Sequence, residues 1–241
     1  MTAKAENVVL LHGFAGTHRA WDGVCEHLPT ERYRPVALDL PGHGELLDAP
    51  RPLTFGGCVE SVLARAPERF VLAGYSMGGR IALHIALTAP ERIERLVLIS
   101  TTAGISDPEE RARRSEADHR LADEVQAGTI EDFVDRWRSQ AMFAEDPPEV
   151  GMRARADQSR NHPDSVAAAL RGIGTGEMQP LWERLGELRM PAVVLAGTRD
   201  VKFRALGERM AAELPDARFL LTPGGHGLPY EVPEAVADAI G

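Results

Sequence analysis

One pentapeptide, Gly74-Tyr75-Ser76-Met77-Gly78, has the G-x-S-x-G pattern of a turn that presents a reactive serine. The apolar run Arg69–Gly74 precedes it, and a helical pattern over Met77–Ala89 follows it and stops at Pro90. A sharp strand-to-helix turn requires small neighbours and holds its central side chain at the positive end of the helix dipole. We therefore predict that Ser76 is the reacting group of an active site. The alternative is a tight glycine turn without chemistry.

A serine hydroxyl reacts readily only when a histidine takes its proton. Among eight histidines, His226 lies in a glycine-rich segment between the last apolar run and a final helical pattern. His84 lies inside the helical pattern that follows Ser76, and we expect it to face packing or solvent. Other candidates occupy glycine turns or the middle of the chain, namely His12, His43, His119 and His162. We predict that His226 is the base.

A carboxylate must orient that imidazole. Asp200 follows the apolar run Pro191–Gly197 through a short loop, so it should emerge at the same edge of a sheet as His226. Asp39 is the rival, but it precedes Ser76 in the chain, and we interpret it as a hydrogen-bonding residue at the end of a strand. The order serine, aspartate, histidine is the one that α/β-hydrolases use.

A developing anion needs preorganised N–H donors. In the hydrolase arrangement one donor lies in the loop after an early strand, and the other belongs to the residue after the nucleophile. The segment Leu10–Gly16 (LLHGFAG) ends the first apolar run. We predict that the backbone amides of Phe14 and Met77 form an oxyanion hole, although the HGF sequence by itself also suits a turn without chemistry.

Short apolar runs alternate with helical patterns along most of the chain. The runs are rich in Val and Leu and do not alternate with polar residues, as in parallel strands buried on both faces. They are Val8–Leu11, Pro35–Leu40, Arg69–Gly74, Arg95–Ser100, Pro191–Gly197 and Ala217–Leu221. This alternation predicts an α/β fold with a mostly parallel sheet flanked by helices.

The alternation stops between Thr101 and Met190, where helical patterns replace the apolar runs. These patterns cover Pro108–Ala127, Ile130–Gln140, Pro147–Arg160, Asp164–Arg171 and Gln179–Leu188. We predict an α/β core made of residues 1–101 and 190–241, with a helical cap of residues 102–189 inserted in it. A cap after a strand would lie over the sheet edge where such folds bind ligands.

The chain has 241 residues, 44% of them hydrophobic, which suits one globular domain with an insertion. Its net charge of −9 disfavours binding to nucleic acid or an anionic membrane. Two cysteines make no disulfide framework, no apolar run approaches a membrane span or signal peptide, and no metal-ligand spacing occurs. We expect a cytoplasmic monomer or small homo-oligomer that uses no metal and no cofactor.

Four segments resemble landmarks of the α/β-hydrolase superfamily across most of the chain: LLHGFAG, LDLPGHG, GYSMGGR and PGGHG. Three stretches resemble more narrowly the 2-succinyl-6-hydroxy-2,4-cyclohexadiene-1-carboxylate synthases, a family of menaquinone (vitamin K2) biosynthesis. They are GYSMGGR, with Tyr75 and Arg80; EERARRSEAD and FVDRWRSQAMF, with Arg114, Trp137 and Phe143; and RNHPDSVAAALRGIGTGEMQPLW.

This narrower resemblance implies a lyase that eliminates pyruvate from a cyclohexene carboxylate without cleaving an ester. Ser76, made basic by His226 and Asp200, would remove a ring proton alpha to a carbonyl, and the oxyanion hole would hold the anion that results. The substrate is a small polycarboxylate, which the family binds through arginines, residues well suited to carboxylates.

The resemblance assigns substrate binding to Tyr75, Arg80, Arg114 and Trp137. Arg80 lies one helical turn beyond the reactive serine, so its side chain can reach the same mouth. Trp137 also belongs to a helical apolar stripe with Phe133, so a core position is equally open.

The chain departs from the family at one cap position. Where the family has a third arginine, this chain has Gln158, flanked by Arg155 and Arg160, either of which could substitute. The same triad would also serve a serine hydrolase, either a carboxylesterase or a C–C bond hydrolase. A non-catalytic ligand receptor on the same fold is the third alternative.

Overall fold

A computed structural model of the protein describes residues 5–241, so the polar segment Met1–Lys4, in which we expected no signal, lies outside the described residues. Six strands form one sheet in the order β2-β1-β3-β4-β5-β6, and every neighbouring pair is parallel. The strands are β1 (Glu6–Leu11), β2 (Tyr33–Leu38), β3 (Phe70–Tyr75), β4 (Ile93–Ile99), β5 (Ala192–Gly197) and β6 (Ala217–Thr222). The predicted fold class is confirmed.

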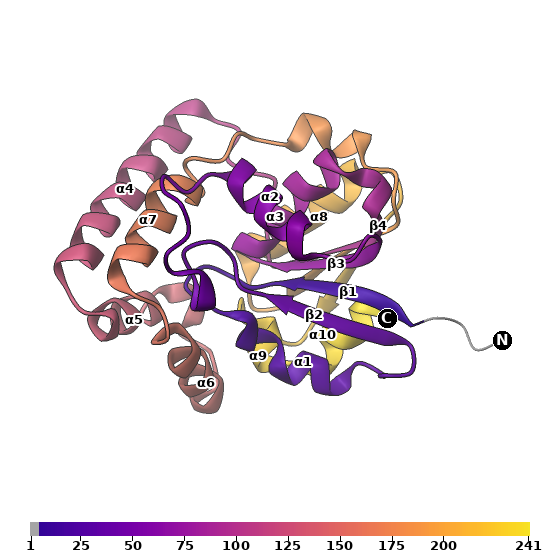
Figure 1. The fold of residues 1–241 in the computed structure, drawn as a ribbon, viewed down its shortest axis with the longest axis horizontal. Coiled ribbons are helices and arrows are strands. Elements are labelled where there is room, and N and C mark those ends of the chain that lie inside the picture. Colours follow the sequence, from indigo (N-terminus) through magenta and orange to yellow (C-terminus); the bar gives the residue numbers. More distant parts are fainter. Residues whose placement is uncertain (1–4) are drawn as a thin grey trace.

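Helices cover both faces of the sheet (Figure 1). Successive residues of a strand point to opposite faces, so Leu96 and Leu98 of β4 pack into one core while Val97 and Ile99 pack into the other. The helices on the first face are α2 (Phe55–Arg65), α3 (Met77–Thr88) and α8 (Val201–Glu213). Those on the second face are α1 (Asp22–His27), α9 (Leu228–Glu231) and α10 (Pro233–Ile240).

The two outermost strands differ from the prediction of burial on both faces. β3 and β5 are buried at every position, whereas several residues of β2 and β6 are exposed or half-buried. Both are edges of the sheet, where one side of the strand has no neighbouring strand to cover it. Their apolar runs therefore indicated strands correctly but overstated the burial.

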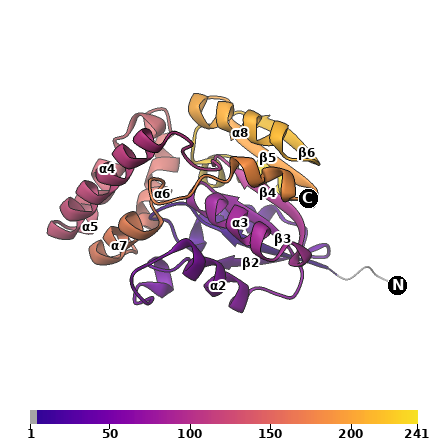
Figure 2. The ribbon, with the colours of Figure 1, turned by 90° about the horizontal axis from the view of Figure 1, so that it is seen from above.

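Four helices between β4 and β5 lie together beyond the carboxyl ends of the strands, on the left of Figures 1 and 2. They are α4 (Pro108–Ala127), α5 (Ile130–Arg138), α6 (Pro148–Gln158) and α7 (Pro163–Ile173). A separate apolar cluster joins α4, α5 and α7 and includes Ala122, Phe133, Val134, Val166 and Leu170. The same cluster contains Ala15 from the loop after β1, so these helices pack on one another and on that loop.

The last predicted helix of this region is wrong in type. Gln179–Leu188 contains only a 3₁₀ helix, η5 (Trp182–Glu187). Its start is tied to the segment after β4, because the Leu181 amide donates to Ala103 O and the Trp182 indole N–H donates to Gly104 O. These two hydrogen bonds and the restricted backbone of Pro180 hold the chain in a short turn. A regular α-helix therefore does not form here.

Across residues 5–241, no helix has both the length and the apolar character that crossing a membrane demands.

Candidate active site

Ser76 occupies a strained turn between β3 and α3. Its backbone has φ 52° and ψ −108°, a conformation that side chains rarely adopt. The turn fits only because a Cβ at Gly74 or Gly78 would collide with backbone, that of Gly78 and of Leu11 respectively. The Ser76 amide donates to Ile99 O at 2.9 Å, which fastens the turn to β4. The close packing and this hydrogen bond keep the turn in its strained shape. The hydroxyl is therefore held in one place above the sheet.

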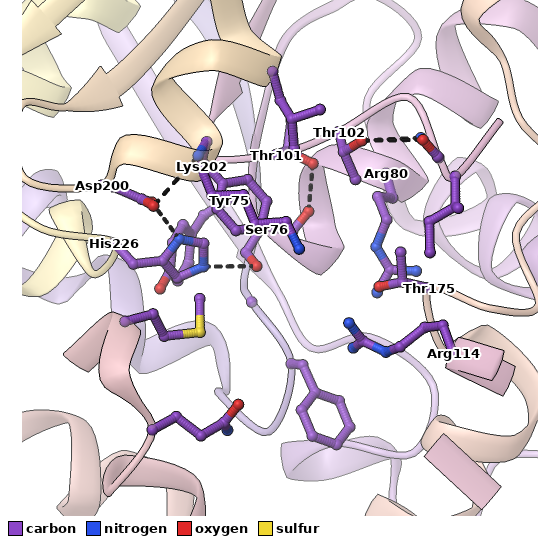
Figure 3. A pocket seen from close by; sticks show the side chains of 18 of the residues that line it. Tyr75, Ser76, Arg80, Thr101, Thr102, Arg114, Thr175, Asp200, Lys202 and His226 are labelled. Atoms are coloured by element: carbon purple, nitrogen blue, oxygen red, sulfur yellow. Dashed lines mark hydrogen bonds and ion pairs between the residues drawn. The ribbon is translucent and has the colours of Figure 1, made fainter. Parts of the chain in front are cut away.

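The structure brings Ser76, His226 and Asp200 together from three different loops (Figure 3). The imidazole Nε2 lies 3.1 Å from Ser76 Oγ, and Nδ1 lies 2.7 Å from Asp200 Oδ2. The carboxylate accepts from Nδ1–H, so Nε2 is left to accept the hydroxyl proton. The imidazole and the carboxylate are buried, which excludes competing water from the relay. This geometry can turn the serine into a base or a nucleophile.

Aromatic rings surround the imidazole. Its ring centre lies 4.5 Å from that of Phe203, 5.5 Å from that of Tyr75 and 5.9 Å from that of Phe143. Such packing restricts rotation of the ring between its two hydrogen bonds. Asp200 is fixed as well, because its Oδ1 accepts from the Phe203 amide at the start of α8.

The loop that carries Phe14 passes directly beside Ser76, because a Cβ on Gly13 would lie 3.5 Å from the serine Cβ. His12 supports this loop: its Nδ1–H donates to Gly13 O at 2.8 Å, and its Nε2 accepts from the Leu40 amide at 3.0 Å. Burial lowers the pKa of His12. The ring is therefore kept neutral, as both hydrogen bonds require.

The second predicted oxyanion donor, Met77, is the first residue of α3, and the first amides of a helix have no partner within it. The Met77 side chain packs in the core, so only its backbone can serve the site. Phe14 lines the cavity described next, with its ring 4.8 Å from the ring of Trp137. Met77 follows Ser76 in the chain and the loop of Phe14 passes beside Ser76, so both amides belong to segments next to the serine.

A cavity of about 530 Å³ lies between the sheet edge and the cap helices. The predicted residues that line it are Phe14, Tyr75, Ser76, Arg80, Arg114, Trp137, Asp200 and His226. Its size suits a small molecule. In the view of Figure 3, Arg80 and Arg114 lie on the other side of Ser76 from His226. A ligand could therefore meet the triad at one end and two guanidinium groups at the other.

Arg80 is a buried cation without a carboxylate partner among the residues that the structure describes. Its Nη1 donates to Ile173 O at 2.8 Å, and the guanidinium lies 5.6 Å from the centre of the Phe55 ring. Burial, helped by the positive charge of Arg114, lowers the pKa of Arg80 to about 10. The group is still charged at neutral pH. An anionic ligand would therefore offset the unfavourable free energy of burying that charge.

Arg114 reaches the cavity from α4 and forms an ion pair within its own helix. Its Nε donates to Asp118 Oδ1 at 2.8 Å, one turn along. The second oxygen, Oδ2, is buried without a hydrogen-bond partner in the described part of the chain. Thr175 faces the same space from the Gly-Thr-Gly stretch (Figure 3). The stretch marked the family resemblance, but its spacing gave no sign that Thr175 lines the site.

Tyr75 and Trp137 border the cavity as apolar walls. Tyr75 is buried, and burial raises the pKa of its hydroxyl, so it stays protonated. Trp137 packs at 5.8 Å against Phe133, centre to centre, and also faces the cavity. Trp137 is half-buried: one part of its ring packs in the apolar stripe, and it also lines the cavity, so its role in substrate binding stays a prediction.

Neither flanking arginine takes the place of the family's third arginine. Arg155 pairs with Asp135 at the surface, and Arg160 is exposed, whereas Gln158 itself lines the cavity. Arg138, which no sequence motif marked, also lines the cavity and pairs with Asp146 at 2.5 Å. Both side chains are buried, so Asp146 offsets most of that cation's charge.

The remaining candidates have structural roles. Asp39 accepts from the amides of His18 and Glu45 at the end of β2, as we interpreted it. His84 stacks on Phe55 at 4.6 Å, which agrees with the expected packing role. Within residues 5–241, no group of three or more His, Cys, Asp or Glu side chains is placed to hold a metal ion.

A family model described as "Alpha/beta hydrolase family" matches residues 8–239. The chain belongs to the α/β-hydrolase family. A Bacillus subtilis (strain 168) protein, provisionally named 2-succinyl-6-hydroxy-2,4-cyclohexadiene-1-carboxylate synthase, is 36% identical over 95% of this chain and 86% of its own. The synthase of that name from Salmonella agona (strain SL483) is 31% identical over 98% of this chain and 92% of its own.

A solved structure agrees with these relatives. MenH from S. aureus superposes with a TM-score of 0.91 at 31% sequence identity, covering 99% of this chain and 93% of that one. The resemblance that three sequence stretches indicated is therefore confirmed at the level of the whole chain.

Proposed function

We propose that this protein is a lyase of menaquinone biosynthesis. It eliminates pyruvate from 2-succinyl-5-enolpyruvyl-6-hydroxy-3-cyclohexene-1-carboxylate and yields 2-succinyl-6-hydroxy-2,4-cyclohexadiene-1-carboxylate, the product in the names of its relatives. The observation that carries the proposal is the pairing, in one cavity, of the Ser76–His226 contact at 3.1 Å with the buried guanidinium of Arg80, which forms no ion pair within residues 5–241. The first supplies a base, and the second supplies an anchor for a carboxylate.

The chemistry follows from the positions of the double bonds in substrate and product. Ser76 Oγ, its own proton passed to His226 Nε2, removes the C2 proton alpha to the succinyl carbonyl. The electron pair forms C2=C3, the C3=C4 pair moves to C4=C5, and the C5–O bond breaks. The enolpyruvate that departs takes up the proton that His226 held and becomes pyruvate, so the imidazole is neutral again and no water is consumed.

The backbone amides of Phe14 and Met77 have the task of stabilising the enolate oxygen that forms on the succinyl group. Fixed donors of this kind typically contribute a factor of ~10²–10³ in rate each. Asp200 stabilises the imidazolium that exists while His226 holds the proton. All three interactions strengthen only once proton transfer begins. They therefore stabilise the transition state more than the bound substrate, and this accelerates the reaction.

Two guanidinium groups give the cavity its preference for a polycarboxylate. Arg80 is buried against Ile173 O, and Arg114 extends from the cap. Because one comes from the core helix α3 and the other from α4, a bound substrate bridges the proposed core (residues 1–101 and 190–241) and the proposed cap (residues 102–189). Gln158 supplies an uncharged contact where a third cation is expected from the resemblance.

The proposal includes a cytoplasmic enzyme. Cys25 and Cys58 are both free in the structure, and burial raises the pKa of the Cys58 thiol to about 12, which suits an unreactive packing role. A monomer or small homo-oligomer suffices, since every residue of the proposed site comes from one chain.

A pyruvate-release assay with the purified protein tests the function. The enolpyruvyl substrate should yield pyruvate, detected by coupled oxidation of NADH, while nitrophenyl esters turn over barely at all. Fast ester hydrolysis without pyruvate release would instead establish the alternative, a serine hydrolase that uses the same triad. Absence of both activities, with the serine unreactive to a fluorophosphonate, would leave only a ligand receptor.

A further inference from the structure

The loop that carries Phe14 is held from outside by the end of α6, a helix of the proposed cap. The carboxylate of Asp157 accepts from the Thr17 amide at 2.9 Å and also from the Thr17 hydroxyl. It accepts a third hydrogen bond, at 2.7 Å, from the hydroxyl of Tyr230. These contacts join residues 140 and 73 positions apart in the chain. One carboxylate thus joins the cap, the loop after β1 and helix α9.

Asn161 makes a second connection to the same loop. Its Nδ2 donates to Ala15 O at 2.6 Å, and its Oδ1 accepts from the Gly44 amide at 3.0 Å. Ala15 has a positive φ of 58°, which an alanine rarely adopts. The Gly16 amide closes the turn onto Gly13 O at 3.0 Å. A strained turn keeps its shape only when its surroundings hold it, and here two cap side chains do so.

Asp157 is buried, so its carboxylate must be stabilised by the groups around it. Its three donors are neutral, and within residues 5–241 no cation forms an ion pair with it, so hydrogen bonds alone stabilise the carboxylate. Burying a carboxylate in this way is unfavourable unless every acceptor is satisfied. Burial and Asp157 together raise the pKa of Tyr230, so its hydroxyl keeps the proton that it donates. The arrangement therefore fixes both the loop and the cap.

We propose that Asp157, supported by Asn161, is a positioning residue for the oxyanion loop. The inference rests on the proposed role of the Phe14 amide. Because that amide belongs to the peptide between Gly13 and Phe14, a shift of the Gly13–Thr17 turn changes its direction and distance. The neighbouring residue Gln158 lines the cavity. A single turn of α6 thus faces the ligand on one side and holds the oxyanion loop on the other.

The expected signature of Asp157 separates it from a residue that only binds substrate. Complete loss of one oxyanion donor typically lowers kcat by ~10²–10³. An Asp157 variant should displace the Phe14 amide rather than remove it, so kcat should fall by roughly 10- to 100-fold. The KM for the polycarboxylate should change by less than about threefold, because the guanidinium groups stay in place.

The test compares Asp157→Ala and the near-isosteric Asp157→Asn with Ser165→Ala. Ser165 is a matched control, since its hydroxyl donates to Leu47 O at 3.1 Å and links α7 to the core without touching the oxyanion loop. Circular dichroism and thermal melting establish that each variant folds. We expect kcat to fall in both Asp157 variants and to stay within about twofold of wild type in Ser165→Ala. Unchanged kcat, or a rise in KM alone, in a folded Asp157 variant overturns the proposal.

A second readout keeps this inference separate from the identity of the substrate. A fluorophosphonate labels a reactive serine, and its phosphoryl oxygen needs the same amide donors. The labelling rate of Ser76 should fall by a similar factor in both Asp157 variants. If the wild-type protein is labelled but releases no pyruvate, the proposed reaction fails while the labelling rates still decide the role of Asp157. If wild-type Ser76 is not labelled although the protein releases pyruvate, only the inference about Asp157 fails. If it is neither labelled nor releases pyruvate, both proposals fail.

Discussion

Asp200 and His226 meet through a hydrogen bond of 2.7 Å although they are 26 residues apart, because they follow two strands that are parallel neighbours. The pairing of β5 with β6 places Gly197 beside Thr222, so the loops after both strands begin at the same level of the sheet. A Cβ at Gly197 would collide with the backbone of Gly224 and Gly225, which shows how closely the two loops pass. The sheet register therefore determines the distance between acid and base.

Replacing Ser76 by alanine should abolish the relay while leaving the fold intact. Alanine at φ 52° is about as strained as serine, so thermal stability should change little. In another serine enzyme, removal of the corresponding group lowers turnover by about 10⁶, and here we expect at least ~10⁴ in pyruvate release. The measurement is steady-state kinetics of Ser76→Ala. A loss below about tenfold would show that another group removes the proton.

Asp200→Asn tests the orienting role of the carboxylate. An amide can donate to Nδ1, which stabilises the tautomer that has its proton on Nε2 and therefore cannot accept one from Ser76. The same change in a serine protease lowers kcat by about 10⁴ with the geometry kept. We expect a decrease of at least 10³ in kcat, with KM little affected. Activity near the wild-type level in Asp200→Asn would assign the acid role to a different residue.

Arg80→Gln should weaken binding of the polycarboxylate selectively. Charge-assisted hydrogen bonds contribute roughly 1.5–3 kcal/mol, which predicts an increase in KM of about 10- to 100-fold. A neutral nitrophenyl ester should be affected less than threefold, because it offers no carboxylate. Arg171→Gln is the matched control, since Arg171 pairs with Asp123 at the surface and does not line the cavity. Equal effects of Arg80→Gln on both substrates would refute the anion-binding role.

The sequence was sufficient for the central strands and for the helix that follows Ser76, because these elements follow local rules. An unbroken run such as Val71–Ala73 is buried on both faces when its strand lies inside the sheet, and Pro90 ends α3 whatever packs against it. The sequence did not predict that several residues of β2 and β6 are exposed. An edge position depends on the order of strands in the sheet, which no single run contains.

The triad residues were found because each lies in the turn or loop that follows a strand, and parallel strands end at one edge. Their roles stay predictions until the variants are measured. The contacts of Arg138 with Asp146 and of Asp157 with Thr17 could not be found in this way. They depend on how the cap is seated on the core, and this seating is set by many weak contacts spread along α4–α7 rather than by a motif.

Acid should destabilise the protein through His43, which is fully buried beside the oxyanion loop. Its Nδ1–H donates to Pro41 O at 3.2 Å, and Nε2 has no partner in the part of the chain that the structure describes. Burial, with a smaller contribution from His12, lowers the pKa of His43 from 6.5 to about 3. Between these values the unfolded chain binds a proton that the folded protein does not, so the free energy of unfolding falls as the pH falls.

The contribution of one such histidine is roughly 1.4 kcal/mol per pH unit in this interval. Denaturant unfolding at pH 7.5, 6.0, 5.0 and 4.5 should therefore give a shallower loss of stability for His43→Asn than for the wild type. The stability that His43 contributes while neutral is fully present above pH 6.5 and decreases toward the folded pKa. His27→Asn, which changes an exposed histidine of α1, should keep the wild-type slope. Equal slopes for wild type and His43→Asn would mean that His43 becomes protonated in the folded protein as readily as in the unfolded chain.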